Sequence, residues 1–279
     1  MKNMNVIIKK NILERAKQAR KILKNCELCP RQCGVDRTSG ETGFCRLDDS
    51  VRYFREVLYF NEERELNPSY QIFFPGCNLR CEYCAVSPWN EQPSSTKLID
   101  YEYLANKTSF HYSRGAKTLN LLGGEPAVSL HGILELLGRI DSPIKVVWNS
   151  NMYYNDIVDD LLDGIVDIYL ADLKCGNEKC AKTLLGADDY LDVVKRNILK
   201  AAEHGEVMIR HILLPGHSKC CLEPILKWLK SEIPGVKLSI WDNYLPPAAT
   251  ESAPKEYMSS DEYSRAVELA EHYGIKNIR

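Results

Sequence analysis

Long apolar runs, internal repeats and a strong net charge are all missing from this sequence. No stretch approaches the roughly 18 consecutive apolar residues that a membrane-spanning helix requires. The N-terminal stretch MKNMNVIIKKNILERAKQ lacks the uninterrupted apolar core of a signal peptide. The formal charge of −2 over 279 residues gives no electrostatic reason to expect nucleic acid as the main partner. We therefore expect a cytoplasmic protein that binds neither a membrane nor nucleic acid.

Cysteine, in contrast, is abundant. The chain has 11 cysteines, an odd number that cannot all pair, and thiols stay reduced in the cytoplasm. Cysteines that cluster in that compartment usually bind metal or carry out chemistry. They form three groups, which are Cys26, Cys29, Cys33 and Cys45; Cys77, Cys81 and Cys84; and Cys175, Cys180, Cys220 and Cys221.

From residue 70 onward, short apolar runs alternate with helical patterns. The runs predict strands at 70–74, 117–122, 144–148, 166–173, 207–214 and 236–240, and the patterns between and after them predict helices near 98–113, 129–140, 154–163, 188–204, 219–232 and 259–273. Such alternation implies parallel strands joined by helical crossovers. Six strands are too few for a closed eight-stranded barrel. They predict an α/β fold, an open, partial (β/α)6 TIM-like barrel with its active site at the C-terminal ends of the strands.

The first 69 residues do not follow this alternation. They contain a helical pattern, a cysteine-rich loop and the strand-like stretch VRYFREVLYF. We therefore predict two parts, a small N-terminal helix and cysteine-rich metal-binding extension at 1–69 and the partial barrel at 70–279.

Three cysteines, Cys77, Cys81 and Cys84, follow the first predicted strand with the spacing C-x3-C-x2-C. Each iron of a 4Fe–4S cluster needs one ligand from outside the cluster, usually a cysteine thiolate. Three thiols on one loop therefore hold three irons and leave the fourth open to a substrate or cofactor. A structural zinc ion normally takes four protein ligands, and this loop offers three. Gly76 allows a sharp backbone turn ahead of the first cysteine.

The second predicted strand ends in LLGGEP, which places Gly123, Gly124 and Glu125 at the predicted active-site edge. Two glycines allow a ligand to approach the backbone closely, and Glu125 with the exposed carbonyls can accept hydrogen bonds from an ammonium group. A simple turn between strand and helix is the alternative interpretation of this motif.

Polar side chains also lie on or directly after the next three predicted strands. The amides of Asn149 and Asn151 suit ribose hydroxyls or a carboxylate. Asp172 and Lys174 lie on one face at the rim, and Arg210 offers a planar fork for a carboxylate. Salt bridges among the residues at the barrel rim are the alternative. The candidates are Asn149, Asn151, Asp172, Lys174 and Arg210.

The stretch GCNLRCEYC resembles the cluster motif of the radical S-adenosylmethionine (SAM) enzymes, and GGEP resembles their methionine-ammonium motif. The resemblance implies a partial barrel in which the open iron binds S-adenosylmethionine. It also implies that the reduced cluster cleaves the sulfonium to give a 5′-deoxyadenosyl radical, which abstracts hydrogen.

The DLK and IR…PG segments resemble the pyruvate formate-lyase activating enzymes, and CELCPRQCGVDRTSGETGFC resembles the leader of their poorly characterised homologues. Asn149 stands where the activating enzymes usually have aspartate, and Met152 where they have glycine. These departures leave the choice of substrate open.

The N-terminal cysteines, Cys26, Cys29, Cys33 and Cys45, are spaced C-x2-C-x3-C-x11-C. Four thiolates suit either zinc or a second 4Fe–4S cluster, and both alternatives stay open. For Cys175, Cys180, Cys220 and Cys221 we favour incidental thiols over a third metal site, because adjacent cysteines rarely bind the same ion. His211 is expected to be packed rather than catalytic.

The sequence thus predicts an enzyme, a radical SAM oxidoreductase whose partners are S-adenosylmethionine, a flavodoxin- or ferredoxin-type reductant and a protein or peptide substrate. The first hypothesis for its reaction is hydrogen abstraction from a glycine of a partner enzyme. The second is radical modification of a peptide or small molecule. A third, of another class, is a non-catalytic metal-binding or redox-sensing scaffold, against which the intact GGEP motif argues.

Overall fold

The computed structural model describes residues 2–278 and divides the chain into two compact units. The first unit comprises the residues up to Asn78 together with Val86–Ser150 and Tyr154–Ile168, and the second comprises Leu79–Ala85, Asn151–Tyr153 and the residues from Tyr169 onward. The division at residue 69 drawn from the sequence stays a prediction.

The first unit is built on four neighbouring strands in the order β2 (Arg55–Tyr59), β3 (Ser69–Phe74), β5 (Thr118–Gly123) and β6 (Lys145–Ser150). Strand β2 runs antiparallel to β3, whereas β3, β5 and β6 are parallel. Nearly all residues of β3 are buried, as expected for a parallel strand that is covered on both faces.

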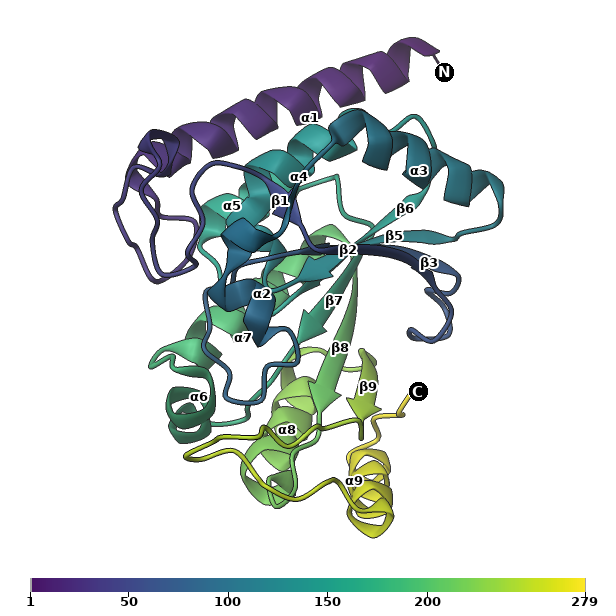
Figure 1. Ribbon diagram of the computed structural model, residues 1–279. Coiled ribbons are helices and arrows are strands. Elements are labelled where there is room, and N and C mark those ends of the chain that lie inside the picture. The colour runs from purple at the N-terminus through teal and green to yellow at the C-terminus, as the bar shows by residue number, and fades with distance from the viewer. Residues whose placement is uncertain (1, 279) are drawn as a thin grey trace. The chain divides into compact units, whose positions relative to one another are not determined.

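Helices and a small antiparallel pair, β1 (Arg52–Tyr53) with β4 (Lys97–Leu98), complete this unit. Helix α4 is buried on almost every side and packs against α1, which Figure 1 shows lying along it. No helix within residues 2–278 is long and apolar enough to cross a membrane. The helices of this unit are α1 (Lys2–Ile22), α2 (Ser87–Glu91), α3 (Tyr101–Ser113), α4 (Leu130–Leu137) and α5 (Asp156–Leu162).

The second unit has the strand order β7 (Ile168–Asp172), β8 (Glu206–Ile212) and β9 (Lys237–Trp241), in which β8 and β9 are parallel. Its helices are α6 (Glu178–Leu185), α7 (Tyr190–His204), α8 (Glu223–Glu232) and α9 (Ser260–His272), and a π-helical turn, η5 (Ser218–Leu222), leads directly into α8. Each strand is followed by helical structure, so the alternation that the sequence predicts is preserved.

All six predicted strands and all six predicted helices are present, with boundaries that shift by a few residues. The mixed α/β class with a mostly parallel sheet is therefore confirmed. The sequence analysis missed α6 although its end signals are clear. The Asn177 side chain caps its first turn, and Gly186 ends it in the left-handed conformation.

Replacing Gly132 of α4 by alanine is expected to destabilise the protein. An added Cβ would lie 2.2 Å from Val51 Cγ2 and 2.5 Å from Val51 Cγ1, and this overpacking outweighs the higher helix propensity of alanine. We expect Gly132→Ala to lose about 1–3 kcal/mol in free energy of unfolding, measured by anaerobic urea denaturation. The control is Glu135→Ala on the same helix, which removes an exposed ion pair with Arg139 and should cost less than about 1 kcal/mol. Equal losses in the two variants would contradict the prediction.

Candidate functional site

The cysteine loop begins with a turn that only glycine fits. Gly76 has a φ of 82°, in the left-handed region that favours glycine. A Cβ at this position would lie 2.7 Å from Leu47 Cδ1 and 2.9 Å from Cys45 O. The expected sharp turn ahead of Cys77 is therefore confirmed, and the close contact with the N-terminal segment gives a second reason for glycine.

The later part of the loop belongs to the second unit and is held by backbone hydrogen bonds. The Arg80 and Glu82 N–H groups donate to carbonyls at the end of α6 over 2.9 and 3.0 Å, and the Cys84 N–H donates to Cys81 O over 3.1 Å. The Glu82 carboxylate in turn accepts a hydrogen bond from the Ala253 N–H over 2.8 Å. Cys81 and Cys84 thus lie on a tight turn, and hydrogen bonds to the end of α6 and to Ala253 hold this turn in place.

The two glycines of GGEP bring two segments of the protein's own backbone together. A Cβ on Gly123 would lie 2.1 Å from Phe74 O, and a Cβ on Gly124 would lie 2.1 Å from Gly76 O. The Gly124 N–H donates to Phe74 O over 2.7 Å, and the Glu125 N–H donates to Gly76 O over 2.9 Å. The sequence suggested that these glycines allow a ligand to approach, but the structure gives a different reason for them. They bring the end of β5 against the start of the cysteine loop.

Glu125 is fully buried, and its carboxylate already has partners within the chain. Oε1 accepts hydrogen bonds from the Ala127 N–H over 3.0 Å and from the Ser150 hydroxyl over 2.8 Å. Through the first bond Glu125 caps the short 3-10 helix η4 (Pro126–Ser129). The residue therefore ties the end of β5 to the end of β6, and its contact with an ammonium group stays a prediction.

At the end of β6, Asn149 is buried and its Nδ2 has no hydrogen-bond partner among the residues that the structure describes. An unpaired buried amide is costly and calls for an explanation.

In the short segment of the second unit that follows β6, Asn151 Oδ1 accepts a hydrogen bond from the Tyr153 N–H over 2.8 Å. Met152 adopts a φ of 57°, in the left-handed region that favours glycine.

Asp172 and Lys174 form an ion pair after β7, with 2.8 Å between Lys174 Nζ and Asp172 Oδ2. The second carboxylate oxygen, Oδ1, is buried and has no hydrogen-bond partner within the described part of the chain. Burial raises the pKa of the Cys81 thiol to about 12, which the Lys174 ammonium partly offsets. The DLK charges and a cysteine of the loop are therefore neighbours. The salt bridge considered from sequence forms, and it leaves one carboxylate oxygen unsatisfied.

Arg210 lies on β8, where its guanidinium stacks 4.7 Å above the Trp241 ring. The next residue, His211, is buried, and its Nδ1 lies 2.7 Å from Leu173 O. Burial lowers the pKa of His211 to about 4, so the imidazole is neutral at physiological pH. The expectation that His211 is packed is confirmed.

The four N-terminal cysteines lie close enough to influence one another electrostatically. Burial raises the pKa of Cys29 to about 12, and the neighbouring thiols of Cys45, Cys26 and Cys33 add to the effect. The Phe44 N–H donates to Cys33 Sγ over 3.2 Å. The four thiols therefore interact electrostatically, and the metal centre that the sequence assigns to them stays a prediction.

A buried arginine lies beside this group. Arg37 Nη1 is 3.9 Å from Cys26 Sγ and also donates to Val128 O over 2.9 Å, and two more of its donors reach Asp48 O. Burial raises the pKa of the Cys45 thiol, and the positive charge of Arg37 partly offsets this increase.

The N-terminal cysteine segment also contacts the start of the cysteine loop. Arg31 Nε donates to Asn78 O over 2.9 Å, and the Arg31 guanidinium lies 4.0 Å from the Phe44 ring centroid. Together with the contact between Gly76 and Cys45 O, this bond connects the two cysteine-rich segments within the first unit.

One cluster that the sequence analysis did not favour is also present. The second unit brings Cys180, His217, Cys220 and Cys221 together, with their ligand atoms all within 4.8 Å of one another. Their wide separation in sequence hides this group, although the Cys-Cys pair close to a histidine is a weak signal for it.

The family of this chain follows from its sequence. The model of the Radical SAM superfamily matches residues 72–229, which is more than half of the chain and includes the cysteine loop and the GGEP turn. The chain belongs to the radical SAM superfamily. Enzymes of the radical SAM superfamily use a 4Fe–4S cluster and S-adenosylmethionine, so the catalytic class predicted from the sequence is confirmed at this level.

This radical SAM chain is also similar to individual proteins and solved structures. An uncharacterized protein of Methanocaldococcus jannaschii is 36% identical over 282 residues, covering 96% of this chain and 81% of that protein. A radical SAM methyltransferase from Sphaerobacter thermophilus has a TM-score of 0.54 at 13% identity over 82% of this chain and 76% of its own. Streptococcus suis SuiB bound to S-adenosylmethionine has a TM-score of 0.53 at 15% identity over 71% of this chain and 45% of its own. At such identities the structural likeness shows the fold alone, which is the predicted partial barrel.

Gly124→Ala is expected to reduce loading of the cluster. The new Cβ would collide with the carbonyl of Gly76, a backbone atom that cannot move without displacing the cysteine loop. After anaerobic reconstitution, we expect the variant to retain less than half of the iron of the wild type. Gly164→Ala is the control, because its added Cβ meets nothing within 4 Å, although its φ of 67° costs some stability. Full iron content in Gly124→Ala would show that the close contact is dispensable.

Proposed function

We propose that Cys77, Cys81 and Cys84 hold a 4Fe–4S cluster and that the protein reductively cleaves S-adenosylmethionine to abstract hydrogen from a substrate. The family match across residues 72–229 carries this proposal. The donor set fits the group, because three thiols on one loop leave one iron free for the cofactor. When bound, the cluster supplies the electron that breaks the sulfonium bond, so the protein has to bind, orient and shield the reactants.

The polar residues at the strand ends suit the cofactor in their charge and in the hydrogen-bonding atoms that they leave unsatisfied. The buried Asn149 amide in the first unit and the buried Asp172 Oδ1 in the second unit have no hydrogen-bond partners among the described residues, so each is open to a polar ligand. The Lys174 ammonium and the Arg210 guanidinium offer positive charge for a carboxylate. We assign Gly123, Gly124, Glu125, Asn149, Asn151, Asp172, Lys174 and Arg210 to S-adenosylmethionine.

For Glu125 the contacts refine this assignment. Its Oε1 is engaged by Ala127 and Ser150, so this oxygen fixes the turn that presents the backbone carbonyls. We therefore propose that Glu125 acts mainly by positioning the turn, while the turn itself receives the ammonium group of the cofactor.

We propose a second metal centre at Cys26, Cys29, Cys33 and Cys45. The amide N–H at Cys33 and the Arg37 guanidinium at Cys26 are the donors that stabilise thiolates. Zinc and a second 4Fe–4S cluster both fit four such ligands. Because this segment contacts Gly76 and Asn78, the metal at this centre would hold the start of the catalytic loop in place.

For the substrate, we propose a glycine of a partner enzyme, from which hydrogen is abstracted with electrons supplied by a flavodoxin- or ferredoxin-type reductant. The DLK and IR…PG segments that resemble the activating enzymes support this choice. A peptide substrate is the second candidate, because SuiB has been captured with its precursor peptide, at a TM-score of 0.51 to this chain. A glycyl radical signal in a co-purified partner would distinguish the two.

Substituting all three loop cysteines by alanine is expected to abolish cofactor cleavage. We expect the wild type, reconstituted anaerobically with dithionite and S-adenosylmethionine, to release 5′-deoxyadenosine, and the Cys77/Cys81/Cys84→Ala protein to release none. The iron and zinc that remain in the triple variant would identify the metal at the N-terminal cysteines. No release by a wild type with a full, reducible cluster, tested also with candidate partner proteins, would reject the proposed function.

Asn149→Ala is expected to weaken S-adenosylmethionine binding without loss of iron. The change removes the unpartnered Nδ2 donor, and losing one hydrogen bond to a ligand costs about 1–1.5 kcal/mol, roughly tenfold in affinity. Equilibrium dialysis with reconstituted protein measures this directly. The Asn155→Ala variant is the matched control, because the half-buried Asn155 amide already donates to Glu27 O. Unchanged affinity in Asn149→Ala would remove this residue from the proposed cofactor site.

A further inference from the structure

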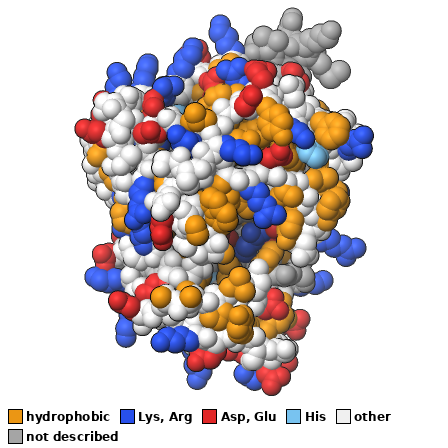
Figure 2. Space-filling view, in the orientation of Figure 1, with side chains coloured by type: hydrophobic (Ala, Val, Ile, Leu, Met, Phe, Trp, Pro, Cys, Tyr) orange, Lys and Arg blue, Asp and Glu red, His pale blue; other side chains and the backbone are white. Residues whose placement is uncertain are grey.

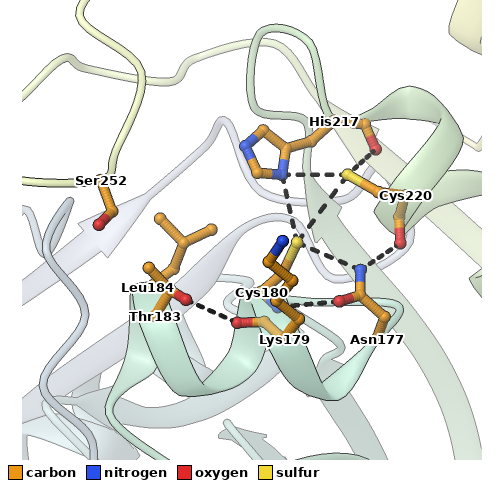
Figure 3. Close-up of a pocket in the computed structure, with 8 residues that line it drawn as sticks. All are labelled: Asn177, Lys179, Cys180, Thr183, Leu184, His217, Cys220 and Ser252. Atoms are coloured by element: carbon orange, nitrogen blue, oxygen red, sulfur yellow. Dashed lines mark hydrogen bonds between the residues drawn. The ribbon is translucent and has the colours of Figure 1, made fainter.

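Four potential metal ligands, Cys180, His217, Cys220 and Cys221, lie close together in the second unit, and Figure 3 shows the first three of them. His217 Nδ1 lies 3.7 Å from Cys180 Sγ, 3.4 Å from Cys220 Sγ and 3.7 Å from Cys221 Sγ. Cys180 Sγ and Cys220 Sγ are 3.9 Å apart. No two of the four ligand atoms are more than 4.8 Å apart.

Four of the six separations, the three S···N distances and the Cys180–Cys220 S···S distance, match the edges of a tetrahedron around one zinc ion. With Zn–S of about 2.3 Å and Zn–N of about 2.0–2.1 Å, ideal tetrahedral geometry gives S···S edges of about 3.8 Å and S···N edges of about 3.6 Å. The observed values differ from these edges by a few tenths of an ångström. A cubane cluster would need its cysteine sulfurs farther apart, because each one binds a different iron.

Hydrogen bonding alone does not explain the arrangement. A ring nitrogen of histidine makes one hydrogen bond, either as donor or as acceptor, yet three sulfur atoms lie around the Nδ1 of His217. A disulfide does not explain it either, because all of these cysteines are free and a disulfide needs an S–S distance of about 2.05 Å. A cation at the centre would satisfy all four groups at once.

The local fold explains how adjacent cysteines can share one ion. His217, Cys220 and Cys221 stand at positions i, i+3 and i+4, which lie on one face of a helical turn. The turn η5 is widened to a π-helix, and His217 O accepts hydrogen bonds from both the Cys221 and the Leu222 N–H groups. Such π-turns frequently mark functional sites. Cys180, from the first turn of α6, supplies the fourth ligand.

Surrounding residues orient the cysteines as the outer residues of metal sites do. Asn177 Nδ2 lies 3.1 Å from Cys180 Sγ and donates to Cys220 O, while its Oδ1 accepts from the Cys180 N–H over 2.8 Å. Gly176 leaves room for η5, since a Cβ there would lie 2.0 Å from Cys221 O. One side chain thus connects α6 and η5, the two elements that carry the ligands.

We propose that Cys180, His217, Cys220 and Cys221 bind one zinc ion through three thiolates and the imidazole Nδ1. Four protein ligands close the coordination sphere, which is the pattern of structural zinc sites. The ion would link the start of α6 to η5 and α8. Cys180, His217 and Cys220 also line a pocket of about 510 Å³, so the ion enters from the surface without unfolding this unit. Binding replaces the thiol protons, so zinc displaces up to three protons as it binds.

The first test is the metal content of the anaerobically purified holoenzyme. We expect His217→Ala and Cys180→Ala to lose about one zinc per chain relative to the wild type, with iron unchanged. His217→Cys, which restores a fourth zinc ligand, should keep the zinc. Cys175→Ala is the control, because Cys175 is a buried neighbouring thiol outside the group of four. Zinc content in His217→Ala equal to that of the wild type would overturn the proposal.

A second measurement does not depend on whether the variants fold. Zinc K-edge X-ray absorption of the wild-type holoenzyme reports the ligands of zinc alone, whatever iron the protein contains. We expect one nitrogen and three sulfur neighbours per zinc, or one nitrogen and seven sulfurs per two zinc ions if the N-terminal cysteines also bind zinc. Absence of zinc from the holoenzyme, zinc without a nitrogen neighbour, or a Cys180–Cys220 disulfide found by mass spectrometry would each reject the site.

Discussion

Two backbone hydrogen bonds hold together the part of the candidate site that lies in the first unit of the chain. The Gly124 N–H donates to Phe74 O over 2.7 Å, and the Glu125 N–H donates to Gly76 O over 2.9 Å. They join the end of β5 to the start of the cysteine loop, and Glu125 extends the connection to Ser150 at the end of β6. On its other side Gly76 packs against Cys45 O, so the N-terminal cysteines share the same contact. A side chain at Gly76, Gly123 or Gly124 would separate these segments.

The sequence predicted the strands well because parallel strands are buried on both faces and appear as short, continuous apolar runs. It predicted the cysteine loop because all three cysteines lie within eight consecutive residues of the sequence. It did not predict the group around His217, whose members come from two elements about 40 residues apart and include an adjacent cysteine pair. The widened turn η5 places both of those sulfurs beside one imidazole. The amino-acid composition of that segment does not predict a π-helix.

The glycines show where reasoning from sequence identified the right residues for a different reason. The sequence suggested that Gly123 and Gly124 leave space for a ligand. In the structure, the backbone of Phe74 and Gly76 fills the space that a Cβ on Gly123 or Gly124 would need. A sequence indicates that a side chain is absent, but it does not indicate which neighbour uses the space. Met152 shows the opposite case, because it adopts a φ of 57° without being glycine. Its carbonyl accepts a hydrogen bond from the Asn197 amide over 2.7 Å, which offsets part of the backbone strain.

Ligand number distinguishes the roles that we propose for the three cysteine groups. Four ligands complete the coordination of a zinc ion or of a four-iron cluster, so such a centre gains stability and has no position left for a substrate. The N-terminal group and the group around His217 both offer four, whereas the loop after β3 offers three. Reactivity toward a cofactor requires an open position, and only the loop leaves one. The two complete groups lie next to structures that need to be held still, the start of the catalytic loop and the junction of α6 with η5. In the arrangement that we propose, the reactive, incompletely ligated cluster is thus supported by two centres that are themselves unreactive.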